Sequence, residues 1–247
     1  IGTNKGLQVY SQTNEKMNRV KLAEEAKLEG NALQINAFHE MGDGQVWIGT
    51  NRGLFAFELS TGKMRYSPHY AIASILSISD QKLLIGTLKN GLYAYDIQTD
   101  KYSFINSPHS NTGALAPESE AASKSPFIHV TGIVKRTDNE FFISTWGQGV
   151  FLYHAVNHQL SEFAVGLPDL FIRQIQHESV DKYWVATRTG LYLLDLFSGV
   201  TTNSVELKTT NELDDAEKRV TKLFRAKNNN IWIATAGYGL FEFVAQS

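Results

Sequence analysis

Residues 47–57 read WIGTNRGLFAF, and five further segments of the chain follow the same pattern. An apolar residue, Ile or Val, a small residue and Thr come first, and a few variable residues, Gly and then Leu or Val follow them. The other copies begin at Ile1, Leu84, Phe142, Trp184 and Trp232. Their threonines recur at intervals of 37 to 58 residues. A pattern that returns at this spacing indicates a protein built from one repeated structural unit.

Each copy has the composition of two β-strands joined by a tight turn. Trp47 to Thr50 is short and apolar, as expected of a buried strand. Gly53 follows where the backbone must turn with a positive φ, and an aromatic-rich strand comes next. A further strand is expected before each copy and an outer strand after it. The expected first strands are 34–38, 74–78, 130–134, 172–176 and 220–224, and one outer strand is 64–67.

Four antiparallel strands per copy predict an all-β protein, a β-propeller, because propeller blades repeat every ~40–50 residues with four strands each. We expect a single domain or fragment over residues 1–247. Its predicted blades are approximately 1–30, 31–70, 71–107, 127–166, 167–209 and 217–247.

Two stretches interrupt the pattern. Residues 106–126 hold three of the five prolines, and we interpret them as an inserted loop. Residues 20–30 could form one or two helical turns, and we interpret them mainly as outer strand and loop.

The end copies predict incomplete first and last blades, because copy one lacks its first strand and copy six its fourth. We therefore expect a fragment of a larger propeller. An unpaired edge favours pairing with another chain, so we expect a homodimer or imperfect closure.

Composition excludes some classes of protein and leaves others open. Hydrophobic residues make up 43% and charged residues 19% of the 247 residues, which suits a folded core. The net charge of −2 argues against a nucleic-acid partner. There are no cysteines, hence neither disulfides nor a thiol nucleophile. No apolar run of 18 residues occurs, so any membrane attachment is expected only through flanking segments.

The WIGT-x-x-GL-x-x-Y/F pattern resembles the two-component regulator propeller repeat. In that family the repeats build the extracytoplasmic sensor domain of bacterial hybrid two-component or diguanylate-cyclase signalling proteins. The resemblance covers nearly the whole chain. The copy at Phe142 departs from the pattern, with Ser144 in place of Gly and a wider turn. The resemblance implies a periplasmic receptor for small molecules, often oligosaccharides, followed by a membrane helix and a kinase or cyclase.

Residues with catalytic or metal-binding chemistry do not form a known motif. The chain lacks HExxH, GxSxG, a Walker loop and an EF-hand loop. His154 and His158 are four apart, which would suit a metal on a helix, but here they flank an expected hairpin turn. We predict no catalytic residues, no metal and no cofactor.

The variable turn between Thr and Gly is the better candidate for binding, because the repeat constrains only its two ends. Loops on a rigid scaffold are where binding residues concentrate. Cations, aromatics and amides there would suit a polar or acidic small ligand. The candidate residues are Arg52, Lys89, Asn90, Trp146, Gln148, Arg188 and Tyr238.

Loops that enter the first strands are expected at the same rim. They add His69, Tyr70, Phe127, His129, Phe171 and Arg173, of which Arg173 is taken as a candidate. The alternative is that all of these are ordinary polar loop tips.

Three functions follow from these observations. The first is a ligand-sensing periplasmic domain that binds a small molecule such as an oligosaccharide or acidic sugar. The second is a platform for protein–protein interaction or dimerisation, which a broad apolar patch would favour. The third is an enzyme such as a lyase or glycosidase, which would need two carboxylates close together on the rim. We expect the protein not to be an enzyme.

Overall fold

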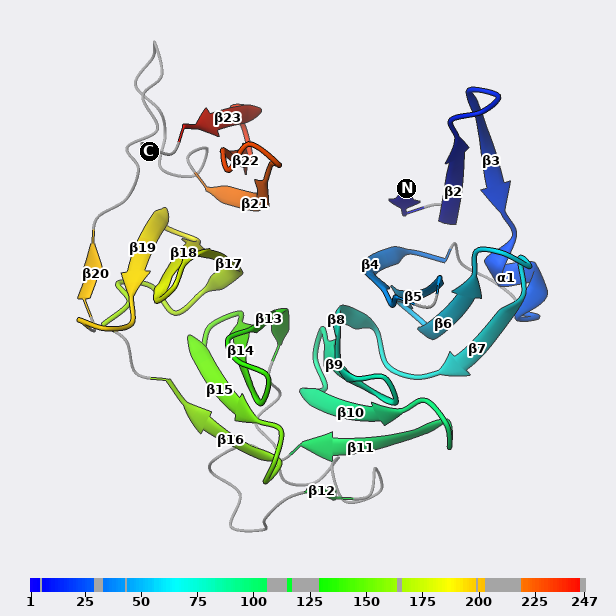
Figure 1. The fold of residues 1–247 in the computed structure, drawn as a ribbon, viewed down its shortest axis with the longest axis horizontal. Helices are drawn as coiled ribbons and strands as arrows, with labels where there is room; N and C mark the ends of the chain where they lie inside the picture. The colour runs from blue at the N-terminus through cyan, green and yellow to red at the C-terminus, as the bar shows by residue number, and fades with distance from the viewer. Residues whose placement is uncertain are drawn as a thin grey trace. The chain divides into compact units, whose positions relative to one another are not determined.

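The computed structural model describes residues 1–4, 6–28, 33–42, 44–105, 115–116, 129–163, 166–198, 200–202 and 219–244. Within these ranges the chain forms six antiparallel sheets of three to five strands, in which each strand pairs with its neighbour in sequence (Figure 1). The predicted all-β class, of the propeller type, is confirmed. The contacts divide the chain into two compact units, Ile1–Val130 and Thr131–Ser247, and each is described by itself.

The described part of the first unit contains three sheets. Their strands are β1 (Gly2–Thr3), β2 (Gly6–Ser11) and β3 (Lys16–Val20); β4 (Ile35–Glu40), β5 (Gln45–Thr50), β6 (Gly53–Glu58) and β7 (Met64–Pro68); and β8 (Ile72–Ser79), β9 (Lys82–Thr87), β10 (Leu92–Asp96), β11 (Lys101–Ile105) and β12 (Leu115–Ala116).

The second unit also contains three sheets in its described part. Their strands are β13 (Val130–Lys135), β14 (Glu140–Thr145), β15 (Val150–His154) and β16 (Gln159–Glu162); β17 (Ile172–Ser179), β18 (Lys182–Thr187), β19 (Leu191–Asp195) and β20 (Val200–Thr202); and β21 (Val220–Arg225), β22 (Ile231–Thr235) and β23 (Leu240–Phe243).

The first strands hold neighbouring sheets of a unit together. Strand β4 lies beside β8, and β17 lies beside β21. His39 Nε2 accepts the Ser77 backbone N–H at 3.1 Å, and burial lowers the pKa of this histidine, which favours the neutral ring that the bond requires. The Gln174 amide bonds both the N–H and the C=O of Leu223, each at 2.9 Å. Directional bonds therefore set the register of one sheet against the next.

Apolar side chains of the second and third strands fill the space between sheets. Trp47 is 1% exposed, lies edge-on to Tyr95 at 5.6 Å and shares a core cluster with Leu54 and Ile72. Trp184 is buried in the corresponding cluster of the last two sheets. Trp232 is only partly buried, because the described strands cover one side of its sheet and leave Phe224, on the neighbouring strand, exposed.

Two irregular stretches can be compared with the prediction. Of residues 20–30, Val20 ends β3, and Leu22–Glu25 form α1, a single helical turn that the outer-strand interpretation missed. Leu22 is buried against Leu7 and Phe55, so this turn covers the edge of a core. Of the expected loop 106–126, only 115–116 is described, as β12 paired with β11; the rest lies outside the described residues. No helix in the described chain is long and apolar enough to span a membrane.

Candidate functional site

The repeated threonine closes the turn that carries the variable residues. Thr145 Oγ1 donates to the Gly149 carbonyl at 2.7 Å and accepts the Gln148 backbone N–H at 3.2 Å. Thr87 makes the same pair of bonds to Gly91 and Asn90. Because the threonine hydroxyl uses both its donor and an acceptor position inside the turn, we interpret the threonine as structural. The variable residues are consequently held on a turn with a defined backbone.

A second set of bonds joins each turn to the loop that enters the first strand of the same sheet. The residue after the threonine donates its N–H to the carbonyl just before that strand. Arg188 bonds Phe171 in this way at 3.0 Å, and Leu88 bonds Ala71 at 2.9 Å. This arrangement places turn and loop side by side.

In the first unit the candidates remain on separate turns. Arg52 follows β5, and its carbonyl accepts the Tyr66 hydroxyl at 2.7 Å. Lys89 and Asn90 follow β9. Lys89 is near His129, where burial and, to a lesser degree, the lysine charge lower the histidine pKa.

The loop histidine of the first unit packs into the protein. The His69 ring is stacked on Tyr102 at 3.8 Å and lies edge-on to Tyr93 at 4.5 Å. Burial lowers the pKa of His69 to about 4, so the ring is neutral near pH 7. We therefore interpret His69 as a packing residue. Phe127, expected at the same rim, lies outside the described residues.

The second unit brings three candidates together with Phe171. The Arg173 guanidinium lies 4.6 Å from the Trp146 ring centre, and the Arg188 guanidinium lies 4.2 Å from that of Phe171. Trp146 meets Phe171 edge-on at 5.2 Å. The four side chains form a row, Arg173–Trp146–Phe171–Arg188, which we call the arginine–aromatic row. It spans two sheets: Trp146 follows β14, whereas Phe171 precedes β17, Arg173 lies in β17 and Arg188 follows β18.

Backbone contacts fix the centre of this row. Trp146 and Phe171 form an antiparallel bridge, and the Leu170 carbonyl accepts the N–H groups of Gly147 and Gly149 at 3.1 and 3.0 Å. The wide turn after Thr145 is thus anchored to the neighbouring sheet. Gln148 lies on this turn, and Tyr238 lies on a separate turn, the one after β22.

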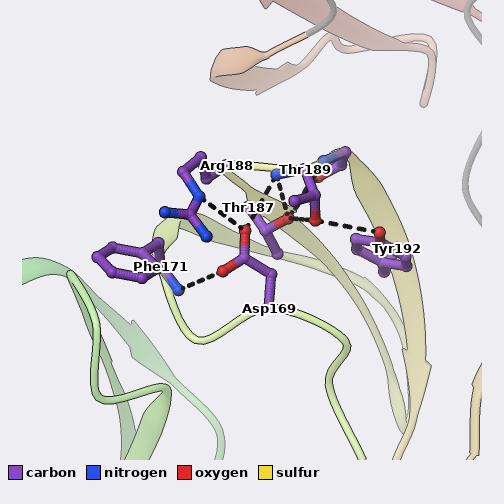
Figure 2. A network of polar contacts seen from close by, with 7 residues as sticks. Asp169, Phe171, Thr187, Arg188, Thr189 and Tyr192 are labelled. Atoms are coloured by element: carbon purple, nitrogen blue, oxygen red, sulfur yellow. Dashed lines mark hydrogen bonds and ion pairs between the residues drawn. The ribbon is translucent and has the colours of Figure 1, made fainter. Parts of the chain in front are cut away.

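Asp169 contacts the backbone beside the row and the Arg188 guanidinium, and sequence reasoning missed this residue. Its carboxylate is buried and accepts the backbone N–H groups of Phe171 at 3.0 Å and Thr189 at 3.1 Å. Figure 2 shows this carboxylate between the loop of Phe171 and the turn of Thr189, with the Arg188 guanidinium beside it; Arg188 Nε lies 3.7 Å from Asp169 Oδ2. The signal in the sequence is the Pro-Asp pair, Pro168-Asp169, before a first strand, where a short acidic side chain can bond backbone N–H groups.

Arg173, at the other end of the row, has a second arginine nearby. Arg219 lies close enough to Arg173 that its charge adds to the effect of burial, and both lower the Arg173 pKa. Arg173 Nε is buried and has no hydrogen-bond partner within the part of the chain that the structure covers. Arg188 is therefore paired with a carboxylate, whereas Arg173 faces a second arginine.

The two histidines of the pair contact different side chains. His154 ends β15 and lies 3.4 Å from Glu140, while the His158 ring bonds the Tyr153 hydroxyl at 2.8 Å. The expected turn lies between them. Among the described residues no group of three or more His, Asp or Glu side chains could hold a metal ion.

Comparison with known proteins identifies the fold. No family model and no curated protein sequence matches the chain. The solved structures that match include extracellular domains of two B. thetaiotaomicron signalling proteins, assigned as the hybrid two-component system BT3049 and the one-component system BT4673. Their TM-scores are 0.70 and 0.73, and their sequence identities are 18% and 19%. The matches cover 97% and 100% of this chain, and this chain spans 31% of the length of each of the two proteins. A computationally designed protein, Ika8, matches at TM-score 0.63 and 13% identity over 99% of this chain and 67% of its own.

At these identities the likeness establishes the fold alone. Two of the three structures are extracellular domains of signalling proteins, which agrees in kind with the resemblance found in the repeats. Membership in the two-component regulator propeller family stays a prediction.

Proposed function

We propose that this chain is the extracytoplasmic sensor part of a bacterial membrane signalling protein and that it binds a small polar or acidic molecule, such as an oligosaccharide or acidic sugar, at the arginine–aromatic row. The observation that carries the ligand site is the convergence of Arg173, Trp146, Phe171 and Arg188 on adjoining turns. The extracytoplasmic role rests on the fold shared with extracellular domains of signalling proteins. A membrane segment and an output domain elsewhere in the full protein complete this proposal.

The chemistry of the row suits such a ligand. Aromatic rings contact the apolar faces of sugars, and guanidinium groups form forked hydrogen bonds to carboxylates. Asp169 is engaged by two backbone N–H groups, which is a structural use of the carboxylate. A receptor therefore fits this arrangement better than an enzyme does.

Removal of two side chains of the row is expected to weaken ligand binding at least tenfold without unfolding the protein. We would screen neutral and acidic oligosaccharides by calorimetric titration against the wild-type protein and a Trp146→Ala/Arg188→Ala variant. The variant should bind any hit at least tenfold more weakly, because both the ring and the cation are lost. A matched control is Phe197→Ala/Lys182→Ala, which also removes an exposed ring and an exposed cation. Both control residues lie at the end of the β17–β20 sheet that is opposite to Arg188.

Two results would count against this site. Equal affinity of the wild-type protein and the row variant would place binding elsewhere. Equal losses in the row variant and the control would show a general effect of the substitutions.

A specific observation supports the second candidate function, a platform for protein association. Phe224, Leu240 and Val244 are 65%, 60% and 62% exposed on or beside the last sheet. Exposed apolar side chains favour protein contacts where they form one contiguous patch. Concentration-dependent self-association in sedimentation experiments, together with no hit in the saccharide screen, would favour this function.

A further inference from the structure

Arg173 occupies a position that serves a structural purpose in other sheets. It follows the first apolar residue of β17, at a β-bulge between Ile172 and Gln174. At the equivalent positions Asn36 donates to the Ile72 carbonyl at 2.9 Å, and Thr131 donates to the Ile172 carbonyl at 2.8 Å. Small polar side chains thus join the first strands of neighbouring sheets. A long cation is not needed for this contact.

Arg173 makes no such bond in the described structure. Its guanidinium lies over Trp146, and its buried Nε has no described partner. No ion pair to Arg173 occurs among the residues whose positions are given, whereas Arg188 is paired with Asp169 and Arg225 with Glu178. A partly buried cation without a counter-charge, near Arg219, is electrostatically unfavourable. An anion bound there would supply the counter-charge that Arg173 lacks among the described residues.

We infer that Arg173 is the specificity-determining residue of the sensor site and that it takes an oxyanion, a carboxylate or a sulfate, carried by a ring-sized ligand that also contacts Trp146. This inference rests on the proposed function and names the ligand class of the same site. The Arg173 guanidinium carbon lies 4.6 Å from the Trp146 ring centre. A guanidinium that contacts a ring can also form a forked pair of hydrogen bonds to an anion through its terminal nitrogens.

The direct probe is a pair of ligands that differ only in charge. Methyl galacturonide and its methyl ester have the same ring, but the ester removes the negative charge. Calorimetric titration of the wild-type protein is expected to give at least tenfold tighter binding of the acid, and this ratio should fall as salt is raised. Sodium sulfate alone, titrated in parallel, distinguishes a free anion from one carried on a sugar.

Variants of Arg173 separate charge from shape. Arg173→Met keeps a long side chain for Trp146 and should reduce the acid-to-ester ratio to about 1, with the affinity for the ester unchanged. Arg173→Lys retains the charge but not the fork, and an intermediate ratio is expected. Thermal unfolding of each variant shows whether the fold is retained, and the lysine variant is informative even if the methionine variant is unstable.

The outcomes distinguish the two proposals. Equal binding of acid and ester, or an unchanged ratio in both variants, would overturn the oxyanion inference and leave the sensor function intact. If sulfate binds as tightly as the acid, the sugar-borne part of the inference is wrong. If neither ligand nor any saccharide of the screen binds the wild-type protein, both proposals fail.

Discussion

Gly53→Ala is expected to lower the free energy of unfolding of the Ile1–Val130 unit by about 3–5 kcal/mol, a large part of the stability of a typical domain. Gly53 begins β6 with a φ of 129°, which a residue with a Cβ seldom adopts. A Cβ there would lie 2.5 Å from the Ser67 carbonyl oxygen and 2.6 Å from the His69 nitrogen. Both are backbone atoms of or beside β7, so the clash can be relieved only by separating the two strands.

Gly62→Ala is the matched control, because it lies in the hairpin that joins the same two strands. Its φ is also positive, at 69°, but a Cβ there meets nothing within 4 Å. This variant carries only the backbone strain, and its free energy of unfolding should fall by about 1 kcal/mol. Urea titrations followed by circular dichroism give both values. Equal losses at the two positions would show that the close approach of β6 to β7 is wrong.

Leu191→Ala is expected to cost about 3–4 kcal/mol in the second unit. Leu191 begins β19, is 2% exposed and packs in a cluster with Trp184, Val220 and Leu223. Truncation would leave a cavity between two sheets whose first strands are held in register by the Gln174 bonds to Leu223. Such a cavity cannot collapse easily, so we expect a cost well above the lower end of the usual range of about 2–5 kcal/mol.

Leu240→Ala tests the same position of the repeat in a copy where this leucine is exposed. Leu240 begins β23 just after the turn glycine, as Leu191 begins β19, yet it is 60% exposed. Its truncation should change the free energy of unfolding by less than about 0.5 kcal/mol. Chemical denaturation of the two variants under one condition measures the difference. A loss at Leu240 as large as that at Leu191 would contradict the described arrangement of the last two sheets.

The regular part of this fold could be predicted from the sequence, because each blade repeats the same local requirements. Gly53 and its five equivalents all have positive φ, between 75° and 158°. Thr50 and its equivalents all bond the carbonyl of the turn glycine. A residue that recurs for a local reason can be recognised in one sequence.

The contacts of the site could be predicted only in part, because they join different copies of the repeat. Trp146, Arg173 and Arg188 were selected by position, but their row depends on Phe171 and on the bridge between two sheets. The position of Asp169, three residues before its first strand, holds His69 and Phe127 in two other copies, so the repeat does not mark it. Likewise Trp232 shares the pattern of Trp47, but what covers a tryptophan depends on the neighbouring sheet, which the pattern does not contain.

A crystal structure of the protein with the tightest-binding saccharide of the screen tests the central claim most directly. The account predicts the ligand against Trp146 and Phe171, with a polar or acidic group within hydrogen-bond distance of Arg173 or Arg188. A ligand bound to the exposed side of the β21–β23 sheet or on the turns of the first unit, without contact to Trp146, Arg173 or Arg188, would contradict it.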